Sequence, residues 1–237
     1  EETNEALKKI ASSGRKILFV ATKKQAKDIV AEKAKSVNMP YITERWPGGM
    51  LTNFVTIRKA VKKMGAIDRM KKDGTFETLS KKERLQVDRL RAKLEKNLGS
   101  ITEMTRLPGA IFIVDTTREH IAVKEAQKLK IPIFAMVDTN SDPRDVDFVI
   151  PSNDDASKSI DKILGLVTGA VAEGLGERKK EKEATSESDA KDMEAAAKAE
   201  ETKAAVAEAD AETTAEEPKK EAPATEASAE ETKEKEA

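Results

Sequence analysis

The side chains of this sequence with the clearest chemical potential are cations that can neutralise phosphate groups. Residues 54–98 hold 14 Lys and Arg side chains but only 6 Asp and Glu side chains. A local excess of positive charge attracts polyanions. The candidate phosphate-binding residues of this segment are Arg58, Lys59, Lys62, Lys63, Arg69, Lys81, Lys82, Arg84, Arg89, Arg91 and Lys93. A solvated helix surface without a ligand is the alternative, and the pattern leaves it open.

A loop with its own binding chemistry leads into this segment, and its sequence is RWPGGMLTNF (residues 45–54). Gly48 and Gly49 allow a sharp turn and close approach of another backbone. Arg45 can pair with phosphate, and Trp46, the only tryptophan, can stack on a base. A purely structural loop explains these residues equally well. Either way, Thr52 or Asn53 is expected to cap a helix that begins near residue 54.

Other candidate residues follow predicted strands, where many α/β enzymes keep their sites. Lys23 and Lys24 follow the first predicted strand and could meet an external phosphate, or could be solvated. The sequence has no G-x-G-x-x-G motif and no P-loop, which argues against nucleotide binding. Asp115 and Asp138 could bind a metal or act as acid and base, but the residues around them also suit turns and helix caps.

No set of reactive residues accompanies these two carboxylates. The sequence has no cysteine, and its single histidine, His120, falls in the first turn of a predicted helix, where we expect it at the surface. We therefore expect no enzyme activity, no cofactor and no metal. The alternative is that the protein is a small-molecule-binding domain or an enzyme. In that case the basic segment would dock on an acidic protein.

Strands and helices alternate on both sides of the basic segment. Continuous apolar runs predict strands at residues 17–22, 41–43, 110–115, 133–138 and 147–150. Helical spacing predicts helices at residues 1–13, 26–37 and 119–129, and another from about residue 154. In the helix of residues 119–129, Ile121, Ala122, Ala126 and Leu129 are expected to face inward. Alternation of this kind predicts a three-layer, doubly wound parallel sheet of about five strands.

The hydrophobic period changes within residues 54–98. Apolar residues recur at steps of three and four, at Phe54, Ile57, Val61 and Met64 and again at Val87, Leu90, Leu94, Leu98 and Ile101. A turn is expected at residues 73–75, and Ser80 with Glu83 forms a capping box. The pattern predicts an inserted antiparallel coiled-coil hairpin whose helices each reach roughly 25–30 Å.

The amino-acid composition changes near residue 177 and separates a C-terminal segment from the rest of the chain. Residues 177–237 hold 11 basic and 20 acidic side chains and almost no large aliphatic residue, which predicts a disordered acidic tail. We expect a sheet domain of residues 1–53 and 99–176, the inserted hairpin of residues 54–98, and the tail of residues 177–237. No apolar run reaches the roughly 18 residues of a membrane span. A soluble intracellular protein is expected.

Several motifs resemble, in order and spacing, those of bacterial small-subunit ribosomal protein number two. They are GRKILFVATKKQA (residues 14–26), RWPGGMLTN (residues 45–53), LPGA (residues 107–110), VDTNSDP (residues 137–143) and DFVIPSNDD (residues 147–155). The resemblance covers about residues 5–175. It implies a flavodoxin-like sheet domain with an inserted coiled-coil hairpin in the ribosome of the cytoplasm. The cations and loop residues named above then become candidate RNA-binding residues.

The same resemblance implies the partners. They are small-subunit rRNA near the junction of head and body, and neighbouring ribosomal proteins, including protein number one, which it helps to recruit. No membrane, no DNA and no homo-oligomer are expected. Family members normally begin with a further segment before the first helix, so this chain is expected to be incomplete.

Overall fold

Five parallel strands form one sheet at the centre of the computed structural model, which describes residues 1–181. The strands are β1 (Ile17–Val20), β2 (Tyr41–Ile42), β3 (Ala110–Val114), β4 (Ile133–Val137) and β5 (Phe148–Pro151). Their spatial order is β2-β1-β3-β4-β5, and every neighbouring pair is parallel. The predicted sheet is confirmed, and this strand order is that of flavodoxin-like proteins.

The central strands are apolar throughout because helices or loops cover both faces of the sheet. Phe19, Phe112 and Phe134 belong to the core on one face, and Leu18 and Ile111 belong to the core on the other. All of them are fully buried. A strand that is buried on both faces has apolar residues at consecutive positions. These continuous apolar runs are visible in the sequence, so the strands can be predicted from it.

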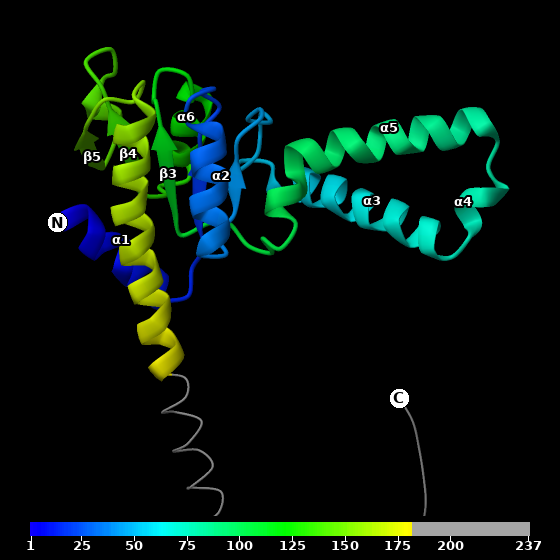
Figure 1. Cartoon of the computed structure of the whole chain (residues 1–237), viewed down its shortest axis with the longest axis horizontal. Coiled ribbons are helices and arrows are strands. Elements are labelled where there is room, and N and C mark those ends of the chain that lie inside the picture. The colour runs from blue at the N-terminus through cyan, green and yellow to red at the C-terminus, as the bar shows by residue number, and fades with distance from the viewer. Residues whose placement is uncertain (182–237) are drawn as a thin grey trace, which may run out of the picture. The chain divides into compact units, whose positions relative to one another are not determined.

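Three helices contribute to the first core. They are α1 (Glu2–Ser12), α2 (Lys27–Ser36) and the helix of residues 157–181 (Figure 1). Helix α6 (His120–Lys128) contributes to the second core, together with the loop of residues 46–51. Within α6, Ala122, Val123 and Ala126 are buried, while Ile121 and Leu129 are exposed. The expectation that Ile121 and Leu129 face inward is therefore wrong.

The segment between β2 and β3 forms helices α3 (Phe54–Lys72), α4 (Thr75–Thr78) and α5 (Lys81–Leu98), followed by the 3-10 turn η1 (Gly99–Ile101). We call residues 54–98 the arm. Helices α3 and α5 lie side by side (Figure 1), and Met64 and Ile67 are buried in the arm. The capping box of Ser80 and Glu83 is confirmed. The short helix α4 lengthens the turn expected at residues 73–75.

The base of the arm belongs to the second core of the sheet domain. Leu98, Ile101 and Met104 are buried in that core, and Phe54 and Ile57 pack against it. Arg58 donates a hydrogen bond of 3.0 Å from Nη1 to the carbonyl oxygen of Met104. The arm is thus anchored by apolar packing and by this hydrogen bond.

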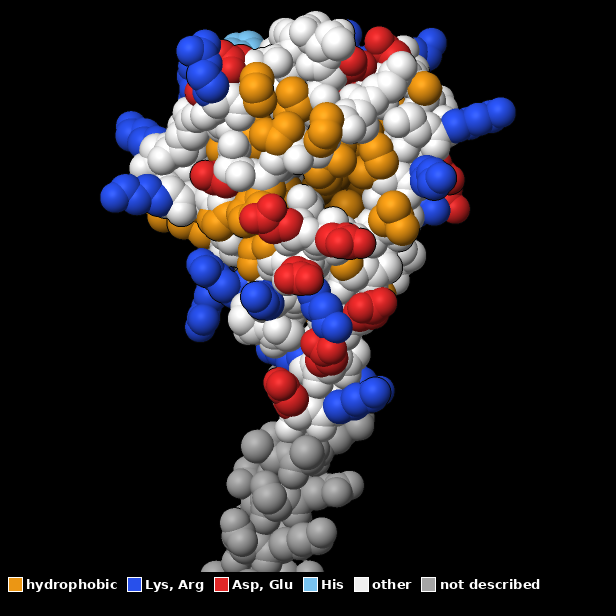
Figure 2. All heavy atoms as spheres, turned by 90° about the vertical axis from the view of Figure 1, so that its left-hand side faces the viewer, with side chains coloured by type: hydrophobic (Ala, Val, Ile, Leu, Met, Phe, Trp, Pro, Cys, Tyr) orange, Lys and Arg blue, Asp and Glu red, His pale blue; other side chains and the backbone are white. Residues whose placement is uncertain are grey.

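The opposite side of the sheet domain, at the edge strand β5, is less covered. Phe148, Val149 and Ile150 are only half-buried, although the Phe148 ring stacks on Phe134 with ring centroids 4.4 Å apart. Figure 2 shows hydrophobic side chains gathered on this face. Among residues 1–181, no helix is both long and apolar enough to cross a membrane.

The predicted acidic tail falls almost entirely outside the described part of the chain. Residues 177–181 still belong to the final helix, and residues 182–237 lie beyond the described residues.

Candidate nucleic-acid interface

Most cations of the arm point into solvent without a partner. Nine of them are exposed, and their side chains have no hydrogen bond or salt bridge to any residue in the described range 1–181. They are Lys59, Lys62, Lys63, Arg69, Lys72, Lys81, Lys82, Arg89 and Lys93. Eight of these are residues that the sequence predicts as candidates, and Lys72 adds to them. Their charges are available to an external anion.

Three further cations, Arg91, Lys71 and Lys96, hold the arm together or tie it to the sheet domain; Lys96 does so through Glu44, 3.3 Å away. Arg91 on α5 binds Asp68 on α3 through Nε and also contacts Glu95 at 2.5 Å through Nη1. The Arg91 guanidinium lowers the pKa of the Asp68 carboxyl and keeps it charged. Lys71 on α3 lies 2.5 Å from Asp88 on α5. Among the candidate residues, Arg91 is therefore engaged within the arm.

Arg58 and Arg84 are half-buried and already donate to backbone carbonyl groups. The partner of Arg58 is Met104, as described above, and Arg84 Nε donates to the Leu79 carbonyl oxygen at 3.0 Å. These two candidates position the base and the turn of the arm. Their remaining guanidinium N–H groups are the part that an external phosphate could reach.

The loop before the arm is organised by one carboxylate, that of Glu125 on α6. Its Oε1 accepts hydrogen bonds from Trp46 Nε1 at 3.1 Å and from the Gly49 N–H at 2.8 Å. Its Oε2 accepts from the Leu51 N–H at 2.9 Å, the Thr52 N–H at 3.1 Å and the Thr52 hydroxyl at 3.3 Å. Five donors thus converge on one side chain that is only 8% exposed.

These donors also determine the charge of Glu125. Burial alone would raise the pKa of its carboxyl group, but the N–H groups of Leu51, Trp46, Thr52 and Gly49 together lower it. Glu125 is therefore ionised at neutral pH. It acts as a fixed negative centre that fastens the loop to the sheet domain.

Trp46 is consequently not available to stack on a base in this structure. Its side chain is 6% exposed and belongs to the second core, and its indole N–H is taken by Glu125. Of the two interpretations of the loop, the structural one fits Trp46. Arg45 is exposed without a partner among the described residues, and Gly48 is exposed as well.

Gly49 serves the turn, and the expected helix cap takes a different form. Gly49 has a φ of 81°, in the left-handed region that favours glycine, and its N–H is bound to Glu125. Asn53 occupies the N-cap position of α3, yet its side chain accepts no cap hydrogen bond from the helix backbone. Asn53 Oδ1 accepts from the Thr56 hydroxyl at 2.8 Å instead.

Lys23 is buried in a group of carboxylates rather than presented to an external phosphate. It is 8% exposed, and its Nζ lies 2.7 Å from Asp154 Oδ1 and 2.6 Å from Asp155 Oδ1. Burial lowers the pKa of Lys23, but the hydrogen bonds to Asp154 and Asp155 outweigh burial and raise it. In this structure Lys23 is therefore engaged within the sheet domain and is not solvated. Lys24 remains exposed.

Asp115 and Glu119, at the same edge of the sheet, also have structural partners. Asp115 Oδ1 accepts from the N–H groups of Thr117 and Arg118, as the turn interpretation predicts. Glu119 accepts hydrogen bonds from the Thr22 N–H and hydroxyl. Burial raises the pKa of the Glu119 carboxyl, although the Thr22 hydrogen bonds oppose that shift. His120 is exposed at the start of α6.

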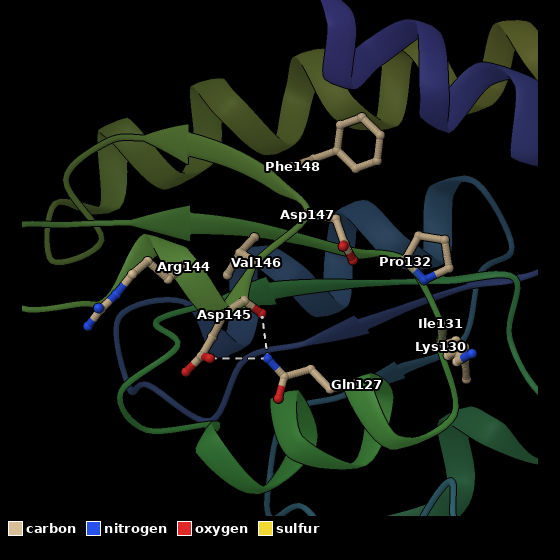
Figure 3. A pocket seen from close by; sticks show the side chains of 9 residues that line it. All are labelled: Gln127, Lys130, Ile131, Pro132, Arg144, Asp145, Val146, Asp147 and Phe148. Atoms are coloured by element: carbon tan, nitrogen blue, oxygen red, sulfur yellow. Dashed lines mark hydrogen bonds between the residues drawn. The ribbon is translucent and has the colours of Figure 1, made fainter.

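A surface pocket of about 470 Å³ lies at the opposite edge of the sheet (Figure 3). One wall carries Gln127, whose Nε2 donates to the carbonyl oxygen of Asp145 at 3.1 Å and to its Oδ1 at 3.2 Å. Pro132 and Asp147 line the pocket directly before β4 and β5. Doubly wound proteins bind ligands at the carboxyl ends of their strands, so this pocket does not support the small-molecule alternative.

The fold and these surfaces define a doubly wound α/β protein with a cationic helical insertion. A family model described as "Ribosomal protein S2" matches residues 1–174. The chain belongs to this family of small-subunit ribosomal proteins, and it is not an enzyme. Its place in the ribosome of the cytoplasm follows from that membership.

Two relatives support the assignment. The chain is 79% identical over 203 residues to the small ribosomal subunit protein uS2 of Flavobacterium johnsoniae, across 85% of this chain and 80% of that protein. It is 77% identical over 211 residues to uS2 of Flavobacterium psychrophilum, across 88% of this chain and 79% of that protein. The resemblance noted in the sequence is confirmed.

Proposed function

We propose that this protein binds small-subunit rRNA near the junction of head and body through the arm, and that it helps to recruit ribosomal protein number one. The observation that carries the proposal is the set of nine exposed arm cations whose side chains make no hydrogen bond or salt bridge in the described structure. Family membership supplies the ribosomal setting, and the cations supply the chemistry. Neighbouring small-subunit proteins are further partners in this proposal.

The spacing of these cations favours a polyanionic ligand over simple solvation. Lys59 and Lys63 lie four residues apart on α3, and Arg89 and Lys93 lie four residues apart on α5. Like charges at this spacing destabilise a helix by about 0.2–0.5 kcal/mol for each pair. A row of phosphates removes that repulsion. The contacts are to the RNA backbone, so the arm recognises the shape of folded RNA rather than its sequence.

The proposal divides the chain into parts with separate roles. The sheet domain of residues 1–53 and 99–176 holds the arm, and the arm of residues 54–98 acts as a coiled-coil hairpin that reaches the RNA. Arg45, Lys24 and the exposed backbone of Gly48 lie outside the arm and are secondary candidates for RNA contact. Of the acidic segment of residues 177–237, the part beyond the described residues, 182–237, has no assigned role in RNA binding.

Charge-neutral substitutions in the arm test the proposal. Lys62, Lys63, Arg89 and Lys93 are replaced together by Gln, since all four are exposed and unpaired within residues 1–181. Arg91 is left intact because it binds Asp68. Each lost phosphate contact lowers the slope of log K against log salt by about 0.7–0.9, so the slope should fall by roughly 3.

A matched control removes four exposed lysines from the sheet domain: Lys124, Lys128, Lys158 and Lys162, each replaced by Gln. Both variants are compared by circular dichroism, by titration with a small-subunit rRNA fragment and by reconstitution of subunits. We expect the arm variant to fold, to bind RNA weakly and to reduce both its own incorporation and that of protein number one. If the arm variant bound RNA as tightly as the wild type, the proposal that the arm binds RNA would be contradicted.

A further inference from the structure

A second cationic surface lies at the edge of the sheet where the strands begin. A pocket of about 600 Å³ there is lined by Arg15, Lys16, Arg106 and Arg178, with Glu103 as its one carboxylate. We propose that this pocket binds a phosphodiester group of the RNA backbone, as a docking point separate from the arm. The inference rests on the proposed RNA-binding function and adds to it a second contact, made by the sheet domain.

Three separate segments bring the arginines together. Arg15 lies between α1 and β1, Arg106 lies in the connection between η1 and β3, and Arg178 lies on the final helix of residues 157–181. Within the described range the side chain of none of the three has a hydrogen bond or a salt bridge. Lys16 differs, because its Nζ donates to the Asn38 carbonyl oxygen at 2.6 Å. The fold thus gathers three unneutralised guanidinium groups, which an anion can stabilise.

Glycines allow two of these arginines to lie directly on the backbone. Gly14 has a φ of 79°, and a Cβ atom at this position would lie 2.2 Å from the guanidinium carbon of Arg178. A Cβ atom on Gly109 would lie 2.6 Å from the Arg15 Cβ. Larger residues at either glycine would displace an arginine. The close packing restricts both side chains before a ligand arrives, which lowers the entropy lost on binding.

The chemistry of the pocket fits a phosphate group. A guanidinium group presents N–H donors in a planar fork that matches two oxygens of a phosphate. The hydroxyl groups of Ser13 and Thr105 line the same pocket and add possible donors. No aromatic side chain lines it, so it offers no surface on which a base could stack. These features favour the backbone of a nucleic acid over a free nucleotide.

A neighbouring pocket makes an extended ligand more suitable than a single small anion. This pocket, of about 350 Å³, shares Lys16, Glu103 and Met104 with the first. It also carries Lys35, whose Nζ lies 5.8 Å from the centre of the Tyr41 ring. The two hollows therefore lie next to each other at the edge of the sheet. A chain of phosphodiesters can occupy both, whereas inorganic phosphate fills only a small part.

The test replaces Arg15, Arg106 and Arg178 by Gln in the full chain. Binding to a small-subunit rRNA fragment is measured over a range of salt concentrations. We expect the slope of log K against log salt to fall by roughly 2 to 3, because up to three phosphate contacts are lost. Affinity at physiological salt should fall at least tenfold. A control with Arg118, Lys158 and Lys162 replaced by Gln removes three exposed charges elsewhere and should keep wild-type affinity.

Separate outcomes distinguish this inference from the proposed function. Weak binding by the arm variant, with wild-type affinity in the pocket variant, would overturn the second docking point alone. Wild-type affinity in both variants would overturn the RNA-binding proposal as well. Thermal shift with millimolar inorganic phosphate is measured in parallel. A phosphate-induced shift that the pocket variant loses, without any change in RNA affinity, would also overturn the inference and identify a small-anion site.

A second variant, with Lys in place of all three arginines, distinguishes loss of RNA contacts from loss of folding. Lys keeps each positive charge but lacks the planar fork. We expect this variant to keep the wild-type salt slope and to bind RNA with an affinity between those of the wild type and the Gln variant. If the Lys variant bound RNA as weakly as the Gln variant while its unfolding midpoint stayed at the wild-type value, phosphate neutralisation could not be the role of these charges.

Discussion

Replacement of Glu125 by Gln should loosen the loop that carries the arm. The carboxylate accepts five hydrogen bonds, two at Oε1 and three at Oε2. A glutamine keeps one carbonyl oxygen and presents an NH₂ group at the other position. In the more favourable orientation that NH₂ group faces the Trp46 indole N–H and the Gly49 N–H, which lose their acceptor.

The expected loss of stability follows from those two donors. A buried donor without an acceptor costs about 1–3 kcal/mol, so the variant should lose about 2–6 kcal/mol. That is a large part of the roughly 5–15 kcal/mol that separates folded from unfolded domains. Replacement of Glu32 by Gln is the matched control, because Glu32 is exposed on α2 without a partner in the described structure. This control should change stability by less than about 0.5 kcal/mol.

The dependence on pH gives an independent check. The folded-state pKa of Glu125 lies below the ordinary glutamate value of 4.5. Its stabilising contribution is therefore complete above pH 4.5 and is lost as the pH falls through the lower folded-state pKa. The difference between wild type and the Glu125→Gln variant should be largest at pH 7 and should shrink below pH 4.

Urea unfolding provides the measurement. Circular dichroism reports the whole fold, and the fluorescence of Trp46, the only tryptophan, reports the loop directly. An unfolding midpoint for Glu125→Gln equal to that of Glu32→Gln would refute the assigned role of this carboxylate. So would a difference from wild type that stays constant between pH 7 and pH 3.

Two further predictions concern stability. Replacement of Lys23 by Met leaves Asp154, which is 1% exposed, without its cationic partner. Loss of one member of a buried ion pair costs about 3–5 kcal/mol, which thermal unfolding at pH 7 should show, and an unchanged Tm would contradict the buried network. Replacement of Ser80 by Ala removes the cap that accepts from the Glu83 N–H, and should cost about 1 kcal/mol. Urea unfolding should reveal that loss, whereas Thr at the same position should largely preserve stability.

The sheet is predictable from the sequence because its physical requirement is local. A strand covered on both faces needs apolar residues at every position, as in Ile17–Val20 and Ala110–Val114. The capping box of Ser80 and Glu83 is equally local, since its two residues are three positions apart. The excess of cations in the arm is visible in the composition. Each of these features is encoded within a few neighbouring residues.

The pairing of charges and the anchoring of the loop are not encoded locally. Glu125 binds donors that lie 73 to 79 residues away in the chain, and Lys23 binds Asp154, which lies 131 residues away. A glycine-rich loop leaves N–H groups that need an acceptor, and this is the one signal that points to such a residue. Nothing in a single sequence says which of the acidic side chains supplies it. Helical spacing instead favours Ile121 and Leu129 as the inward residues of α6.

The same non-local contacts separate the cations that stabilise the arm from those that are left for a ligand. Arg91 and Lys71 join α5 to α3, and Lys96 lies 3.3 Å from Glu44 beside β2. These pairs engage acidic side chains of the arm and its base, so the nine exposed cations are left without a salt bridge within residues 1–181 and repel one another. That repulsion destabilises the free protein slightly, and any bound polyanion removes it. Binding of a polyanion and stability of the arm are therefore linked, because a ligand that binds only the folded arm stabilises it by mass action.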